Sequence, residues 1–428
     1  MSRFEPTTLG EFCSVNSGFA FKSEQFSEDS NDTFLVKGSN LGHRVIRWDE
    51  GPWWDNSDYE KLQRYQLIAD DVVLAMDRPI VGGQLKFAWV KSTDPKSLLV
   101  QRVACLRAKE VSDQVFLRYV IASPAFLQYI DTITTGVNVP HISGPDIRKY
   151  KFNLPIQDER QKIAAVLSAY DDLIENNLER IKLLEEMAQI TYEEWFVRLK
   201  FPGHEEVEVD SETGLPIGWI KASCYDYMDV LSGGTPKTNI EEYWNGDIKF
   251  FTPKDAQTGF FTGNTEKTIT SIGLKKCNSK LYDIGTIFIT ARGTVGKLNL
   301  AHEPMAMNQS CYALRGKEGV PQYFLFCALS KAIDAFKGAA NGGVFDAIVV
   351  DTFKFLSFVR PEVSLVKKFD QMVSPMFDSI YNLLEQNKRL QEARDILLPR
   401  LMTGMIDIEQ VALPEALLER INNENDNN

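Results

Sequence analysis

Positively charged residues beside glycine and proline turns are the first candidates for chemistry in this chain. A turn carries an arginine or lysine side chain beyond the flanking strands, where it can reach phosphates and base edges of a nucleic acid. Five residues combine a positive charge with a neighbouring turn: Arg78, Lys86, Lys254, Arg292 and Lys297. These are the candidate nucleic-acid-contacting residues.

The N-terminal part of the chain combines cationic and aromatic residues. Three tryptophans, Trp48, Trp53 and Trp54, are interleaved with Arg44, Arg47, Arg78, Lys86 and Arg102. Guanidinium groups on loops beside aromatic rings suit contacts with phosphates and base edges. An ordinary strand surface with its tryptophans in the core explains the same residues, and for any single residue this second interpretation is favoured.

The stretch ITARGTVGK, residues 289–297, superficially resembles a phosphate-binding loop of nucleotide-binding proteins. The Walker pattern requires Gly-Lys-Ser/Thr after four variable residues, whereas Leu298 follows Lys297 here. The sequence therefore favours a turn between two strands, with Arg292 and Lys297 exposed.

Patterns that would indicate catalysis or metal binding are absent from the sequence. The four histidines and six cysteines lack metal-ligand spacing, and no CxxC pair occurs. There is no Asn/Asp-Pro-Pro-aromatic tetrapeptide for a flipped base, no glycine-rich methyl-donor loop, and no convincing nuclease carboxylate set. We predict a protein without catalytic, cofactor-binding or metal-binding residues.

The overall composition is that of an ordinary protein with two or three domains in 428 residues. The start, MSRFEPTTLGEF, has no apolar signal core, so we expect a cytoplasmic protein with reduced cysteines. The net charge of −12 is unevenly distributed. Residues 157–210 carry fourteen acidic and six basic side chains, whereas residues 221–317 carry nine and twelve. Basic heads on acidic helices remain compatible with DNA binding, although acidic residues on solvated helix faces explain the same numbers.

Residues 157–200 contain an apolar pattern with alternating steps of four and three. It includes Ile163, Leu167, Ile174, Ile181 and Trp195 and continues for more than four heptads, which predicts a long coiled-coil helix with Asp158 as its N-cap. Such a helix needs a partner.

The pattern returns after a shift of 206 positions, and one asparagine lies in each seam, Asn177 and Asn387. We predict helices at about 158–198 and 364–402 that pack antiparallel, with the asparagines fixing the register. Pro375 favours a helix start or a kink within the second copy. Trp195, Phe196 and Leu401 are candidates for an outer partner interface.

The repeat extends upstream, because Gln101–Arg107 matches Gln309–Arg315 at a shift of 208. The chain therefore reads as two copies of a globular head and a long helix, with heads far less alike than helices. In the first head, strands are predicted near 34–37, 45–48, 71–75, 85–90 and 99–105, with a helix over 115–130. The fold class is α+β: mostly antiparallel heads on an antiparallel coiled coil, with pseudo-two-fold symmetry.

The chain resembles the specificity (S) subunit of bacterial type I restriction–modification systems over essentially its whole length. The resemblance rests on LPIQDERQKIAAVLSAYDDLIENN, SGGTPKTNIEEYWNGDIKFFTPKD, ITARGTVGK, MNQSCYAL and LLPRLMTGMIDIE, in this order and with their duplication. It implies two target recognition domains that each read half of a split DNA site, and helices that dock two methyltransferase (M) subunits. S-adenosylmethionine would belong to the M subunits, and restriction (R) subunits would join for cleavage.

The implied divisions are target recognition domain 1 at 1–156, a helix at 157–200, a linker at 201–220, target recognition domain 2 at 221–362, a helix at 363–405, and an acidic tail at 406–428. Helix rise predicts heads roughly 50–60 Å apart, so the half-sites would be separated by unread base pairs. Two alternatives remain: the S-like subunit or recognition half of a type IIB-like enzyme, and a two-headed protein-binding scaffold.

Overall fold

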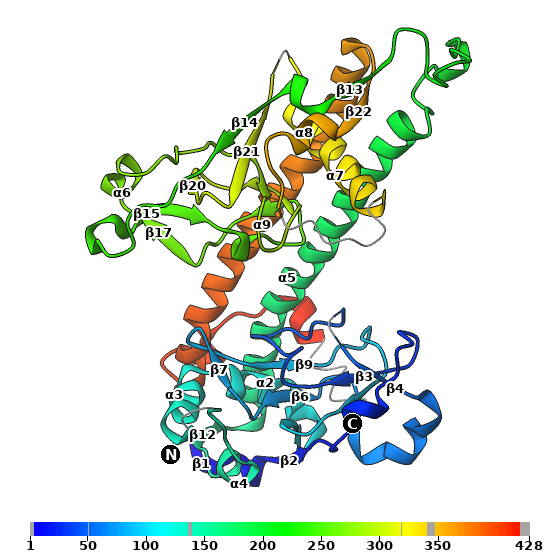
Figure 1. Cartoon of the computed structure of the whole chain (residues 1–428). Coiled ribbons are helices and arrows are strands. Elements are labelled where there is room, and N and C mark those ends of the chain that lie inside the picture. The colour runs from blue at the N-terminus through cyan, green and yellow to red at the C-terminus, as the bar shows by residue number, and fades with distance from the viewer. Residues whose placement is uncertain (1–3, 50, 136–138, 318, 340–346, 420–428) are drawn as a thin grey trace. The chain divides into compact units, whose positions relative to one another are not determined.

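The computed structural model describes residues 4–49, 51–135, 139–317, 319–339 and 347–419. The chain divides into two compact units (Figure 1). The first unit comprises residues 1–174 and 389–428, and the second comprises residues 175–388. Each unit contains one head together with parts of both long helices.

The first head is built on an antiparallel sheet, which we call its main sheet. Its strands, in spatial order, are β2 (Cys13–Ser17), β11 (Val103–Ala108), β6 (Val72–Ala75) and β9 (Phe87–Trp89). Alternate residues face opposite sides, as strand geometry requires. Val72 and Leu74 share a core with Phe116 of α2 (Gln114–Ala122), whereas Val73 and Ala75 pack in another core with Phe34.

A second sheet, the side sheet, contributes to that other core. Its order is β4 (Trp53–Trp54), β3 (Thr33–Val36), β10 (Ser97–Leu99) and β5 (Gln66–Leu67). The pair β3–β10 is parallel, and the other pairs are antiparallel. The mostly antiparallel head is confirmed, but it has two four-stranded sheets. A short hairpin of β7 (Ile80–Val81) and β8 (Gln84–Leu85) forms a separate two-stranded sheet before β9.

Three local predictions for this head are wrong. The strand expected near 99–105 is interrupted, because Gln101 and Arg102 form a turn between the end of β10 and the start of β11. Residues 45–48 form no strand; Ile46 makes only an isolated bridge with Leu41. The expected helix over 115–130 is broken into α2 and α3 (Pro124–Ile133), because Ser123 is extended and caps α3 through its hydroxyl. Proline at the first position of α3 also favours a new helix start there.

The second head has the same kinds of sheet. Its main sheet runs β14 (Met228–Ser232), β21 (Cys311–Gly316), β18 (Ile287–Thr290), β19 (Leu298–Ala301) and β16 (Phe261–Thr262). Its side sheet runs β17 (Lys267–Ile269), β15 (Trp244–Phe251) and β20 (Met305–Met307). Helix α7 (Gln322–Ala339) shares the main core through Phe324 and Leu325.

Strand register shows that the two heads share one backbone frame. Equivalent pairs are Ala75–Val103 with Thr290–Cys311 in the main sheets, and Phe34–Ser97 with Lys249–Met305 in the side sheets. Equivalent positions are therefore offset by 215 up to the end of β6 or β18, and by 208 from β10 or β20 onward. The repeat visible at Gln101 and Gln309 thus covers both sheets, including regions where the sequences have little in common.

Each head is also closed by a pair of strands where the chain enters and leaves it. In the first head, β1 (Phe4–Thr8) pairs antiparallel with β12 (Lys151–Pro155), and a short helix, α4 (Gly144–Arg148), precedes β12. In the second head, β13 (Ile220–Ser223) pairs with β22 (Ser357–Arg360). The long helices begin soon after β12 and β22.

The long helices are α5 (Gln157–Tyr192), continued by a π-helical turn at Glu193–Val197, and α9 (Val363–Met402). In the second unit, Asn177 bonds Asn387, whereas Tyr192 and Trp195 pack on Phe369. Contacts therefore move toward the start of α9 as α5 advances. The predicted antiparallel packing is confirmed.

Two details of the helix ends differ from the predictions. Asp158 lies inside the first turn of α5, because the helix begins at Gln157, so Asp158 is not the N-cap. Helix α9 begins at Val363 and continues through Pro375, so this proline does not start the helix. A proline inside a helix costs one backbone hydrogen bond, and the apolar contacts of Val373 and Phe377 on either side are completely buried.

Candidate nucleic-acid interface

Three cations gather beside one loop of the first head. Lys86 donates its ammonium to the carbonyl of Gly38, and Arg47 donates to the carbonyl of Ser39 at 2.6 Å. Burial lowers the pKa of Lys86, and the nearby charges of Arg47 and Arg78 lower it further. Like charges held this close favour binding of an anion. Of the two predicted contacts here, Arg78 is exposed, whereas Lys86 is partly buried and already bonded to the backbone.

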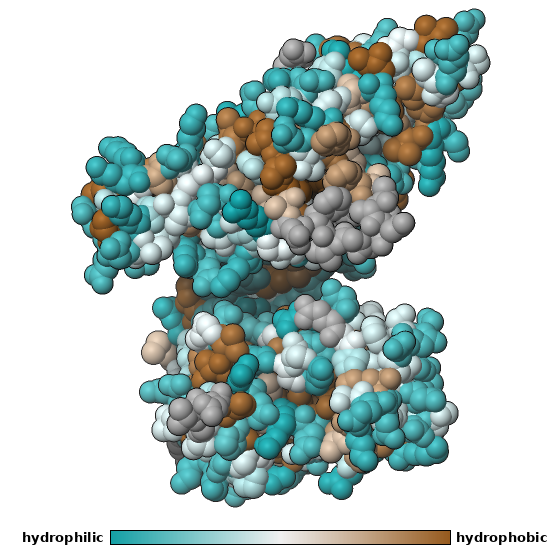
Figure 2. All heavy atoms as spheres, viewed as in Figure 1, coloured by the Kyte–Doolittle hydropathy of each residue, from teal (hydrophilic) through white to brown (hydrophobic). Residues whose placement is uncertain are grey.

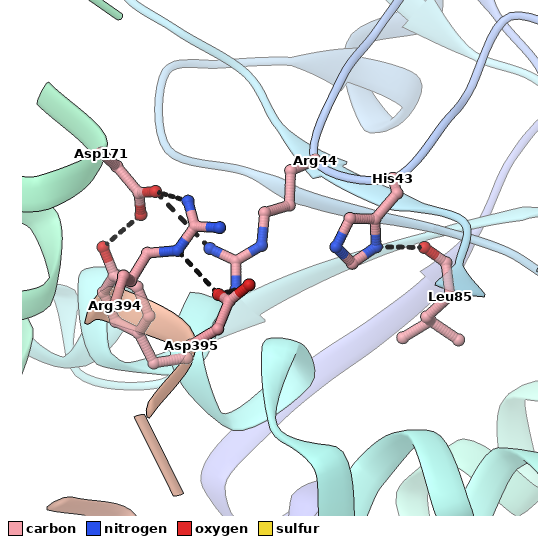
Figure 3. A network of polar contacts seen from close by, with 7 residues as sticks. His43, Arg44, Leu85, Asp171, Arg394 and Asp395 are labelled. Carbon is pink, nitrogen blue, oxygen red and sulfur yellow. Dashed lines mark hydrogen bonds and ion pairs between the residues drawn. The ribbon is translucent and has the colours of Figure 1, made fainter. Parts of the chain in front are cut away.

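The loop that carries Arg47 is fastened to the long helices by buried charges (Figure 3). Arg394 of α9 donates to Asp171 of α5 at 2.5 Å, and Arg44 of the loop lies 3.5 Å from the same carboxylate oxygen. Asp395 accepts a hydrogen bond from Arg394 at 3.0 Å and lies 3.5 Å from Arg44. Tyr119 of α2 donates its hydroxyl to Asp171 at 2.7 Å.

The protonation of this network follows from its contacts. Burial lowers the pKa of Arg44, whereas for Arg394 the attraction of Asp171 and Asp395 outweighs burial and raises the pKa. His43 donates from Nδ1 to the carbonyl of Leu85 at 3.0 Å, and burial lowers the pKa of its ring. This network was not predicted from the sequence. The available signal was Arg394 itself, a charged residue at an apolar seam position of the heptads.

The second head presents its candidate cations on two turns. Lys254 is exposed and lies 3.8 Å from Glu266. Arg292 and Lys297 belong to the turn between β18 and β19, as predicted, with Arg292 exposed and Lys297 half-buried. The Cβ position of Gly293 lies 3.8 Å from Pro253, so the turn that carries Arg292 approaches the one that carries Lys254. Direct DNA contact by any of these residues stays a prediction.

The helix seam contains the two predicted asparagines. Asn177 Nδ2 donates to Asn387 Oδ1 at 2.8 Å and to Gln386 Oε1 at 3.1 Å. Both asparagines are 4% exposed, so the amide groups satisfy one another inside an apolar contact. Their role in fixing register remains a prediction.

The burial of Trp195, Phe196 and Leu401 contradicts their predicted place on an outer partner interface. Trp195 and Phe196 are 7% and 2% exposed, and both pack on Phe369 within the second unit. Leu401 is 2% exposed and belongs to the core of the first head. Because these aromatic and aliphatic groups close cores within their own units, they are not available as an outer surface.

Other apolar side chains of α5 do reach the surface. Leu183, Met187 and Ile190 are spaced by four and three residues, so they share one helix face, and they are 52%, 51% and 59% exposed. We call these three residues the α5 stripe. Figure 2 shows that apolar side chains appear in patches among hydrophilic ones on the visible face. None of the helices in the described ranges is long and apolar enough to cross a membrane.

The fold and its cationic loops define a class of proteins in which two α+β heads alternate with two long helices. Comparison with known proteins gives the family. The profile described as "Type I restriction modification DNA specificity domain" matches residues 1–186 and 216–390. The chain belongs to this family.

Individual relatives agree with this assignment. The MjaIX specificity subunit of Methanocaldococcus jannaschii is 26% identical over 69% of this chain and 70% of its own length. The HindI specificity subunit of Haemophilus influenzae is 24% identical over 62% of this chain and 71% of its own. The crystal structure of an S subunit from M. genitalium has the same fold, with a TM-score of 0.53, 14% identity, and coverage of 93% and 96% of the two chains.

Proposed function

We propose that this protein is the sequence-specific DNA-binding specificity subunit of a type I restriction–modification complex. It would act in the cytoplasm without catalytic residues of its own. The observation that carries the proposal is the pair of heads: one backbone frame holds two different sets of loops and cations. Two such heads suit a site with two half-sequences, because each head offers its own chemistry to the bases.

Chemistry on the DNA would come from partners. Two methyltransferase (M) subunits would supply S-adenosylmethionine and the pocket for a flipped base, and restriction (R) subunits would cleave. The proposal is supported by the family and by the relatives named specificity subunits. The continuous helices α5 and α9, which each contribute to both units, would set the number of unread base pairs between the half-sites.

Methylome sequencing of the host, with and without this gene, tests the function. We expect one bipartite motif to lose methylation when the gene is deleted and to regain it on complementation. Replacing residues 1–156 with the equivalent head of another specificity subunit should change one half-sequence only. A continuous motif, or methylation that is indifferent to the gene, contradicts the proposal.

The α5 stripe is our proposed contact for an M subunit. An exposed apolar face on a solvated helix is disfavoured unless a partner covers it. Ile190→Asp should place an unpaired charge in that interface and weaken co-purification with the M subunit. Leu178→Asp is the matched control, since Leu178 is also 53% exposed on α5 but lies on another face. Equal effects of both substitutions would contradict a contact through the stripe.

A further inference from the structure

Each main sheet has a loop at the edge where two of its strands end together. Strands β2 and β6 both pair antiparallel with β11, so they run in the same direction and end at one edge. Strands β14 and β18 are related to β21 in the same way. The next backbone contact is also shared: Met76 accepts from the amide of Ile142 at 2.9 Å, and Ala291 accepts from that of Ile348 at 2.8 Å.

Beyond this contact the heads diverge. The chain needs residues 76–86 to reach β9 in the first head, but only residues 291–297 to reach β19 in the second. We call these two segments the edge loops. They differ in length and charge while the strands beneath them keep one register, so the edge loops are a place where two heads can differ in what they bind.

Backbone conformation singles out one residue of the first edge loop. Asp70 and Arg78 have φ angles of 70° and 46°. The residues 215 positions later in the second head are glycines, Gly285 and Gly293, with φ angles of 76° and 78°. The left-handed region is unfavourable for residues with a Cβ atom. Asp70 has a structural reason to stay, because it pairs with Arg118.

Arg78, unlike Asp70, has no ion-pair partner within the described part of the chain that would explain its left-handed backbone. Its side chain is exposed and forms no ion pair there, and its charge adds to those of Arg47 and Lys86. A strained, unpaired cation in a cationic cluster indicates a function outside the fold. In the second head the exposed Arg292 precedes Gly293, and it too lacks an ion pair among the described residues.

A different cation is common to both heads at the same sheet edge. Ser17 and Ser232 are equivalent strand ends, and each is followed five positions later by an exposed lysine, Lys22 or Lys237. The intervening glycine is required, since a Cβ on Gly18 would lie 2.3 Å from a backbone carbon of Val100. Neither lysine has an ion-pair partner in the described ranges.

We propose a division of labour in DNA recognition: Lys22 and Lys237 contact phosphates, whereas Arg78 and Arg292 of the edge loops read base edges. Phosphate contacts carry no sequence information, so both heads can use the same lysine position. Base contacts must differ between two half-sites, as the edge loops do. Arginine can donate two hydrogen bonds to the major-groove edge of guanine, so each edge loop would read a guanine. This inference rests on the proposed function and names the residues that perform it.

The test uses the full chain in complex with its M subunits and duplexes that carry the motif found by methylome sequencing. Arg78→Gly removes the guanidinium and keeps the left-handed turn, as Gly293 does in the second head. We expect about 10- to 100-fold weaker binding to the motif. Methylation should spread to sites changed at one base pair of one half-sequence, with the other half unchanged. Arg292→Ala should do the same for the other half.

Lys22→Ala should instead lower the affinity for every duplex to the same extent. It should also reduce the slope of log affinity against log salt concentration by about one. Lys109→Ala is the charge-matched control, because Lys109 is exposed after the opposite end of β11, and it should leave binding unchanged. An unchanged motif with Arg78→Gly and Arg292→Ala, or a uniform loss on every duplex, overturns the division of labour. A wild-type complex without a bipartite motif contradicts the proposed function instead.

Discussion

In the first unit a loop of the head reaches the long helices through buried charges, whereas in the second unit the head packs on them mainly through aromatic rings. Asp171 accepts hydrogen bonds from Arg394 and Tyr119 and forms an ion pair with Arg44. In the second unit, the ring of Phe377 on α9 stacks on the rings of Phe260 and Tyr323, with distances between ring centroids of 5.2 Å and 4.1 Å. Both kinds of contact join a head to the long helices, but they differ in which substitutions they tolerate.

The difference in tolerance of substitution follows from the directions and distances that buried ion pairs and apolar packing require. A buried carboxylate between two guanidinium groups must keep its charge and its place, because without it Arg44 and Arg394 would keep only Asp395, whose side chain is 57% exposed, as a charged partner among the described residues. Apolar packing is non-directional, and it tolerates another side chain of similar volume. The contact in the first unit also includes the loop that carries Arg47, so in the first head the helices directly support a candidate DNA-binding loop.

Asp171→Asn gives the largest expected effect. The amide retains the shape of the side chain but leaves Arg44 and Arg394 without its negative charge, so we expect a loss of about 3–5 kcal/mol in the free energy of unfolding. Urea denaturation followed by a first-unit probe measures it. Phe377→Leu is the counterpart in the second unit and should cost less than about 1.5 kcal/mol. Equal losses would remove the distinction between the two kinds of contact.

The asparagine pair offers a neutral comparison with the charged network. Asn177→Leu leaves Asn387 buried with fewer partners, and we expect a loss of about 1–3 kcal/mol. The double substitution Asn177→Leu, Asn387→Leu removes both polar groups, so stability should recover. A double-mutant cycle by urea denaturation checks this, and additive losses would show that the asparagines do not depend on one another.

The two units should respond to pH in opposite directions. Burial lowers the pKa of His43 in the folded first head, so the folded state binds fewer protons than the unfolded state. Stability is then present above the unfolded pKa of about 6.5 and is lost as pH falls below it. His43→Gln should flatten this dependence between pH 7 and pH 5, measured by thermal unfolding. A wild-type first unit that gains stability on acidification would contradict it.

Glu185 in the second unit has the opposite sign. Burial raises its pKa, although the amide of Phe260 donates to its carboxylate at 2.7 Å and partly offsets the rise. Its contribution is therefore full below the unfolded pKa and is lost as pH rises through the folded pKa. Glu185→Gln keeps an acceptor for Phe260, so it should stabilise the second unit slightly at pH 7 and have no effect at pH 4. A destabilised variant at pH 7 would count against this account.

The smallest effect is expected at an exposed ion pair of the second head. Lys254 and Glu266 lie 3.8 Å apart with side chains 80% and 57% exposed, so solvent screens their attraction. Lys254→Ala should change the free energy of unfolding by less than about 1 kcal/mol. Since Lys254 is also a candidate DNA contact, an effect on DNA binding without an effect on unfolding would separate the two roles.

Much of the fold could be predicted from the sequence, because its signals are local. The heptads around Ile181 and Ile380 specify long helices, since residues three and four apart share a helix face. The turn between β18 and β19 was predictable from Gly293 and Gly296. The burial of Asn177 and Asn387 in the helix seam could be predicted because one asparagine occupies a heptad position in each helix.

Tertiary structure decided what no spacing encodes. Arg44 and Asp171 are 127 positions apart, and Asp171 and Arg394 are 223 apart, so only folding brings their charges together. Trp195, Phe196 and Leu401 have the composition of an interface, but the neighbouring elements bury them, and an apolar side chain carries no mark of which partner will cover it. The common register of the heads was also not visible in the sequence, because backbone hydrogen bonds maintain a sheet while side chains diverge. The correspondence of Arg78 with Gly293 therefore became apparent only from the pairing of the strands that precede them.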